Sequence, residues 1–140
     1  MPFNPSKCST ISVSRKHKKI SNQYILHSQP IEHVDTATYL AIGVELSEDL
    51  TWSKHINKTT RKANRKLSFV RRNLQISSEK IKEAAYKGLV RPVLEYCAPI
   101  WDPHHQKYID QLEMVQRRAA RFTLHNYDYR SFVMDMLKKL

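Results

Sequence analysis

The sequence predicts an α+β fold in which N-terminal antiparallel β-strands or hairpins precede a bundle of three to four α-helices. Three observations support this. Apolar and polar residues alternate within the first fifty residues, as in half-buried strands. After residue 51 the apolar residues recur every three or four positions, as in amphipathic helices. The chain has 140 residues and 41% hydrophobic content, which suits one domain with a modest core. We therefore expect a strand region over residues 1–50 and a helical region over residues 51–140.

The alternation is clearest at Leu40, Ile42, Val44 and Leu46, and it predicts a continuous strand there. Two shorter strands are predicted at residues 9–13 and 24–27. Between them lies the basic string RKHKK, residues 15–19, which is typical of an exposed hairpin turn. Its charge can equally serve solubility alone.

Start and stop signals divide the helical region. Ser53 can cap a first helix, and Ser77 or Ser78 can cap a second with Glu79 in its first turn. The second helix should end near Arg91, because Pro92 cannot continue it without a kink.

Asp102 followed by Pro103 is a start signal for a third helix. Its apolar stripe is predicted at Tyr108, Leu112, Val115, Ala119 and Phe122. A last short helix is expected from residue 129 to the end.

The positive charge is focused on one segment. The chain has a formal net charge of +11, and residues 51–75 contain eight Lys or Arg and no acidic residue. Charges in residues 1–50 cancel, and residues 76–140 are only mildly basic. Focused positive charge points to a polyanionic partner, most often nucleic acid.

The same segment has a helical period. An apolar stripe recurs at steps of four and three residues, at Ile56, Thr60, Ala63, Leu67, Val70 and Leu74. The opposite face could follow a phosphate backbone, with an aromatic ring packing on a sugar or base. The alternative is a solvated basic helix whose Phe69 packs on a neighbouring helix. We expect nucleic acid to contact two groups of residues. The first lies on this helix: Lys54, Lys58, Arg61, Lys62, Arg65, Phe69 and Arg72. The second comprises three arginines that lie off the apolar stripe of the third helix: Arg117, Arg118 and Arg121.

Several functional classes lack support in the sequence. Two glycines are too few for a P-loop or a dinucleotide fingerprint, and the seven histidines scatter without ligand spacing, so no metal site is expected. No pair of carboxylates is placed for two-metal catalysis, and the adjacent Glu48 and Asp49 suit a capping turn. Cys97 suits a buried helix contact better than a nucleophile.

Cellular location is bounded only coarsely. Cys8 and Cys97 form no CxxC motif, which suggests reduced thiols in a nuclear or cytoplasmic setting, although a disulfide between them stays possible. There is no secretory signal pattern and no apolar run of membrane-spanning length. We therefore expect neither secretion nor a membrane partner, and a basic amphipathic helix on an anionic membrane is kept as a third alternative.

Six strings carry a family resemblance, and they follow one another over nearly the whole chain. They are FNPSKC (3–8), TYLAIGV (38–44), LTWSKHI (50–56), KANRKLSFVRRNL (62–74), AYKGLVRPVLEYCAPIWD (85–102) and QLEMVQRRAARF (111–122). In this order and at this spacing the chain resembles the end of the reverse transcriptase domain of non-LTR retrotransposons, the LINE-like elements of the jockey and CR1 types.

The resemblance implies that the strands are the last palm strands and that the helices are the thumb, which holds the template–primer duplex. The family's catalytic Asp pair, where the parent enzyme uses Mg²⁺, lies upstream of FNPxKC. This chain would then be a truncated fragment of an RNA-directed DNA polymerase, without activity or cofactor of its own. Its partners would be an RNA–DNA hybrid and the missing palm and fingers.

Two departures from the family pattern bear on this expectation. Thr38 stands where the family has Lys, and Ala41 and Ile42 are inserted before Gly43, which would shift Gly43 by about 7 Å along a strand. Met1 falls where the family has an internal residue. A host-reused protein-interaction module, docking or self-associating through its apolar helix faces, is the alternative function.

Overall fold

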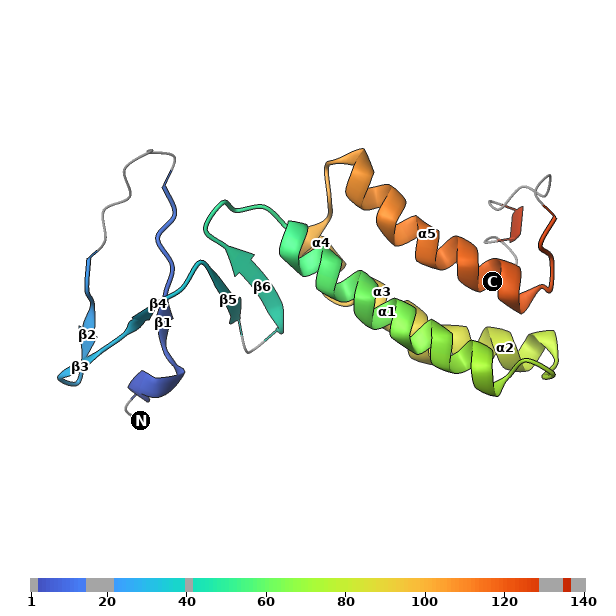
Figure 1. Cartoon of the computed structure of the whole chain (residues 1–140), viewed down its shortest axis with the longest axis horizontal. Helices are drawn as coiled ribbons and strands as arrows, with labels where there is room; N and C mark the ends of the chain where they lie inside the picture. Colours follow the sequence, from blue (N-terminus) through green and yellow to red (C-terminus); the bar gives the residue numbers. More distant parts are fainter. Residues whose placement is uncertain (1–2, 15–21, 40–41, 129–134, 137–140) are drawn as a thin grey trace. The chain divides into compact units, whose positions relative to one another are not determined.

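The computed structural model describes residues 3–14, 22–39, 42–128 and 135–136 (Figure 1). The chain divides into two compact units, Met1–His55 and Ile56–Leu140. The division falls inside the first turn of the longest helix, α1 (Ser53–Asn73). Strands lie in the first unit and helices dominate the second, so the predicted α+β class is confirmed.

The described residues of the first unit form three two-stranded ladders. β1 (Ser9–Thr10) pairs in parallel with β4 (Glu32–His33). β2 (Ile25–Leu26) pairs antiparallel with β3 (Gln29–Pro30), and β5 (Thr36–Tyr39) pairs antiparallel with β6 (Val44–Ser47). A short 3-10 helix, η1 (Pro5–Lys7), precedes them, and Asn4 caps its first turn by accepting from the Ser6 N–H at 3.1 Å.

The continuous strand predicted over residues 40–46 is wrong. Tyr39 and Val44 are cross-strand partners, so the chain turns between β5 and β6 instead of continuing. The Tyr39 carbonyl accepts from the Gly43 N–H at 2.7 Å, and Gly43 has a φ of +64°. Only glycine adopts this left-handed conformation at no steric cost, and this local turn chemistry overrides the alternation. Leu40 and the basic string at 15–19 lie outside the described residues.

The segment leading into α1 is fixed by a carboxylate, as predicted for the Glu48–Asp49 turn. Asp49 accepts two hydrogen bonds of 2.9 Å from Thr51, one from its backbone N–H and one from its hydroxyl. Backbone hydrogen bonding is the main cause that lowers the Asp49 pKa. Ser53 is the first residue of the helix rather than its cap, a difference of one position.

The second unit is built from α1 and two further long helical stretches. The first runs without a break through α2 (Glu79–Ala85), the π-helix η2 (Tyr86–Val90) and α3 (Arg91–Glu95). After α4 (Ala98–Trp101), the last long helix is α5 (Gln106–Thr123). In Figure 1, α1 and α5 run in the same direction. The α2–α3 stretch, which lies between them in the sequence, runs in the opposite direction.

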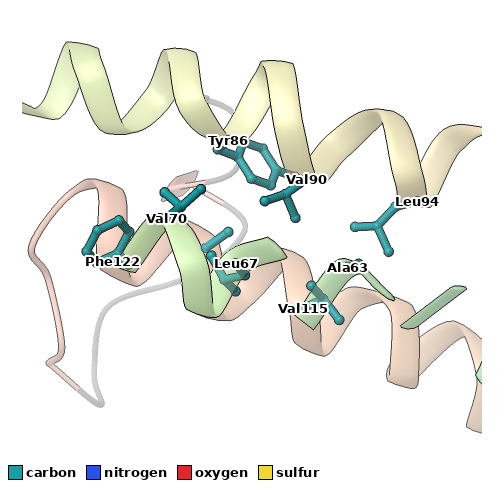
Figure 2. Close-up of a cluster of buried hydrophobic side chains, with 9 residues drawn as sticks. Ala63, Leu67, Val70, Tyr86, Val90, Leu94, Val115 and Phe122 are labelled. Atoms are coloured by element: carbon teal, nitrogen blue, oxygen red, sulfur yellow. The ribbon is translucent and has the colours of Figure 1, made fainter. Parts of the chain in front are cut away.

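The core lies where these three stretches meet (Figure 2). Each contributes buried side chains that point toward the other two, and the predicted stripes of α1 and α5 are confirmed in their centres. The members are Ala63, Leu67 and Val70 from α1, Tyr86, Val90 and Leu94 from the middle stretch, and Val115, Ala119 and Phe122 from α5. Burying each of the Val, Leu and Phe side chains is worth about 1.5–3 kcal/mol.

The second helix does not end at Arg91, which corrects the prediction. The π turn of η2 is the reason. The Arg91 N–H bonds to the Tyr86 carbonyl, five residues back. This widens the turn where the Pro92 ring would otherwise meet the carbonyl four residues before it. The helix therefore passes Pro92 and continues to Glu95.

The π turn also explains the spacing of the buried residues in this stretch. Lys82, Tyr86, Val90 and Leu94 are buried at intervals of four residues. In a regular helix of 3.6 residues per turn that spacing would wind away from the core. One wider turn absorbs the drift and keeps the four side chains on one side.

The third long helix begins later than predicted. Asp102 follows α4 as its C-cap, and α5 starts at Gln106 after His105. Cys97 separates α3 from α4 in a left-handed conformation with φ of 54°, so it lies at a helix break and not within a helix. Both cysteines are free thiols. The predicted final helix falls mostly on residues outside the described part, although Asp135 and Met136 are helical.

Candidate nucleic-acid interface

One face of α1 carries closely spaced cations that all reach solvent. We call this the cationic face and define it by Lys54, Lys58, Arg61, Lys62, Arg65, Phe69 and Arg72, which are all exposed. Its geometry follows from the helix repeat, because Ile56, Ala63, Leu67 and Val70 of the same helix are buried. Burial of the apolar stripe therefore fixes which side of the helix the cations occupy.

The charge on this face is not neutralised within the helix. α1 contains no acidic residue from Ser53 to Asn73. In the described part of the chain, Arg61, Lys62 and Arg65 form no ion pair. Ion pairs are found instead on the other helices, such as Lys87–Glu83 and Arg91–Glu95, each at 2.6 Å. Unpaired cations on one helix face attract phosphate more strongly than cations already paired.

Lys54 occupies the first turn of α1 and differs from its neighbours. Its ammonium donates a hydrogen bond to the Thr36 hydroxyl on β5. This contact lies within the first unit. The other six members of the cationic face belong to the second unit, so these six form a single surface.

Phe69 lies among the cations with 55% of its surface exposed. Arg65 precedes it by one turn and Arg72 follows it by three residues, which are neighbouring positions on a helix surface. More than half of the Phe69 surface is therefore left uncovered by neighbouring residues that the structure describes. An exposed ring between guanidinium groups is a suitable platform for a stacked base.

The three predicted arginines of α5 have different surroundings. Arg117 forms an ion pair of 2.6 Å with Glu113, so its charge is locally offset. Arg118 donates to Asn64 Oδ1 at 3.3 Å and to Met114 Sδ at 3.2 Å, and thus points toward α1. Arg121 is half-buried, and its Nε is buried without a hydrogen-bond acceptor among the described residues. Of the three, Arg118 is the one with a hydrogen bond to α1, so it lies at the α1–α5 contact.

Sequence reasoning missed the polar residues that join α1 to α5. Gln111 Nε2 donates to Asn57 Oδ1 at 2.9 Å, a link between the two helices like that of Arg118 to Asn64. Arg71 was also missed, because it lies on the α5 side of α1 and not opposite the stripe. Its position around the helix axis could have shown this. Arg71 lies about 60° from the centre of the apolar stripe, close to the angular position of Asn64.

Neither a metal site nor a membrane span is found in the described part. Over residues 3–14, 22–39, 42–128 and 135–136, no three His, Cys, Asp or Glu side chains come together as a metal site. The sequence contains no adjacent pair of Asp residues, so the Mg²⁺ ligands that the family resemblance implies have no counterpart here. Among the same residues, every helix is too short or too polar to cross a bilayer.

Comparison with known proteins gives no match to a family model, to a curated protein or to a solved structure.

Proposed function

We propose that this chain binds the phosphate backbone of nucleic acid without sequence preference, with an RNA–DNA hybrid as its natural ligand. The cationic face of α1 carries this proposal. Exposed cations one turn apart lie on a helix without carboxylates, and its opposite side is anchored in a packed core. Such a rigid row of cations suits a regularly spaced row of phosphates. A-form duplexes are recognised mostly through shape and backbone contacts, which requires no base-reading residues.

The choice of an RNA–DNA hybrid rests on the resemblance of six strings to the palm end and thumb of a non-LTR retrotransposon reverse transcriptase. On that basis we propose that the parent chain is an RNA-directed DNA polymerase that uses Mg²⁺. This chain has no adjacent Asp pair, and we propose that it has no polymerase activity or cofactor by itself. Its protein partners would be the palm and fingers of that polymerase, in the nucleus or cytoplasm.

The experiment is a salt titration of hybrid binding, followed by fluorescence anisotropy with a labelled RNA–DNA hybrid. We expect log Kd to rise steeply and linearly with the logarithm of salt concentration, because each neutralised phosphate contributes a slope of about 0.7–0.9. Replacing Lys58, Arg61 and Arg65 together by Ala should weaken binding and lower the slope by about 2–3. Hybrids of unrelated sequence should bind with equal affinity.

A matched control removes the same charge elsewhere. Lys80, Lys87 and Lys107 are exposed and lie on other helices, so their joint replacement by Ala lowers the net charge equally. It should change the slope little. Both triple variants should melt close to the wild-type temperature, since exposed side chains contribute little to packing. A flat salt response, or equal loss of binding in both variants, would contradict the proposed interface.

A second candidate function is a protein-interaction module, and exposed apolar residues favour it. Ile81, Leu89 and Tyr96 along the α2–α3 stretch are each 41% exposed or more, and Ile76 is fully exposed. Scattered exposed residues are normal, but several along one stretch fit association. Sedimentation over a range of concentrations tests this. Self-association that Ile81→Ser and Leu89→Ser abolish, together with weak hybrid binding, would favour this function over the first.

A further inference from the structure

A cavity of about 370 Å³ lies beside the C-terminal end of α1, within the second unit. This volume is in the lower part of the range of roughly 300–1,000 Å³ that small-ligand sites occupy. Its walls come from the last turns of α1, from the end of α5 and from the segment after α5. The residues that matter for its chemistry are Arg71, Arg72, Gln75, Phe122, His125 and Tyr127.

The charges around the cavity select an anion. Arg71 and Arg72 line it from α1, and no carboxylate is among the lining residues that the structure describes. Neither arginine has an ion-pair partner in the described part of the chain. Both lie in the last turn of α1, so they also complement the helix dipole, and this accounts for their position without a ligand. The rest of the lining is therefore needed to decide what the cavity takes.

Aromatic rings form the other side of the cavity. The rings of His125 and Tyr127 are 6.0 Å apart at an interplanar angle of 67°, and Tyr127 is 57% exposed. Phe122 is buried, and Lys82 Nζ lies 5.0 Å from its ring centre. Guanidinium groups next to an accessible ring suit a phosphate joined to a flat base. The Gln75 amide adds a donor and an acceptor suited to a base edge.

We propose that this cavity binds one unpaired nucleotide, with its phosphate on Arg71 and Arg72 and its base against Tyr127. Arg72 belongs to both the cavity and the cationic face, so a strand leaving a bound duplex can continue into the cavity. In this respect the inference rests on the proposed function. The cavity would add a preference for duplexes that carry a single-stranded extension, which a row of cations alone does not provide.

The test compares two hybrids that differ only in the bases of a short extension. One carries an unpaired extension of normal nucleotides and the other an abasic extension with the same number of phosphates. By anisotropy, the full chain should bind the first at least about fivefold more tightly, the effect of one stacked base. Tyr127→Ala should remove that preference. Arg71→Ala should weaken binding of both extended hybrids, because both carry the phosphate that Arg71 binds. Lys107→Ala, an exposed cation on α5 outside the cavity, should retain it.

Titration with adenosine monophosphate separates this inference from the proposed function. If the chain binds no hybrid, the interface on α1 fails, yet the cavity should still bind this nucleotide, and Tyr127→Ala and Arg71→Ala should abolish the binding. Equal affinity for the two extended hybrids, or a preference that survives Tyr127→Ala, would overturn the inference. Nucleotide binding that neither variant alters would also overturn it, because the site would then lie elsewhere.

Discussion

Gln111 on α5 donates a hydrogen bond of 2.9 Å to Asn57 on α1, and seven residues further along both helices Arg118 bonds to Asn64 at 3.3 Å. The equal spacing shows that α1 and α5 run parallel and in register over two turns. Parallel neighbours in one chain need a return segment, which the α2–α3 stretch provides. The two polar links therefore set the register of the helices that carry and support the cationic face.

The first prediction concerns this register. A double-mutant cycle with Asn57→Ala and Gln111→Ala should give a coupling energy of about 0.5–1 kcal/mol in urea unfolding, because the pair is exposed and water competes for it. A cycle between Asn57→Ala and Arg118→Ala, which do not bond to each other, is the control and should give additive effects. Additivity in the first cycle would show that the bond does not stabilise the unit.

The second prediction concerns Phe69. Replacing it by Ala should reduce affinity for single-stranded RNA about fivefold or more, because a stacked base loses its platform. Melting temperature should not fall, since the ring is mostly exposed. Phe69→Tyr keeps a ring and should keep the affinity. If Ala and Tyr variants bind alike, the ring does not contact bases.

The third prediction uses the two glycines as a matched pair. A Cβ added at either would meet no atom within 4 Å beyond its chain neighbours and, at Gly88, the backbone of its own helix. Gly88 lies in a helical stretch, so Gly88→Ala should raise the free energy of unfolding by about 0.5–1 kcal/mol. Gly43 has a φ of +64°, so Gly43→Ala should lower it by about 1–2 kcal/mol. Equal effects of the two substitutions would contradict the described backbone conformations.

The fourth prediction is a pH dependence. Burial raises the pKa of the Tyr86 phenol above its usual 10.0, so the folded chain keeps the phenol neutral where the unfolded chain ionises it. Its contribution to stability is complete below pH 10 and is lost as the pH rises through the folded pKa. Tyr86→Phe should therefore gain stability relative to wild type above pH 10. A constant difference between the two proteins across pH 8–11 would show that Tyr86 ionises equally in both states.

The positions of the buried core residues in α1 and α5 could be predicted from the sequence. The stripe at Ala63, Leu67 and Val70 is buried because its period matches an α-helix, and the exposed side of α1 follows from it. The continuation of the second helix through Pro92 could not be predicted, since the local rule for proline ignores a π turn several residues earlier. The later start of α5 has a similar origin, because Asp102 and Pro103 are start signals that also suit the end of α4.

The strand region and the cavity could be predicted less well. Alternation at Val44 and Leu46 is a real strand signal, but it does not show that the chain reverses at Gly43. The cavity joins residues from the end of α1 to residues after α5, fifty positions apart. Its assembly depends on the parallel register of two helices, which no local pattern in either helix specifies.

The π turn between Tyr86 and Val90 contains one residue more than a regular α-helix of the same length would contain. Without that residue, the core positions of this stretch would recur at steps of four, three and four, the ordinary pattern of a packed helix. The extra residue forms a local bulge, and the helical residues after it are not rotated about the helix axis. Chain length can therefore vary by one near Gly88 with the core intact. The same change within α1 would turn the rest of that helix by about 100° and bury its cations.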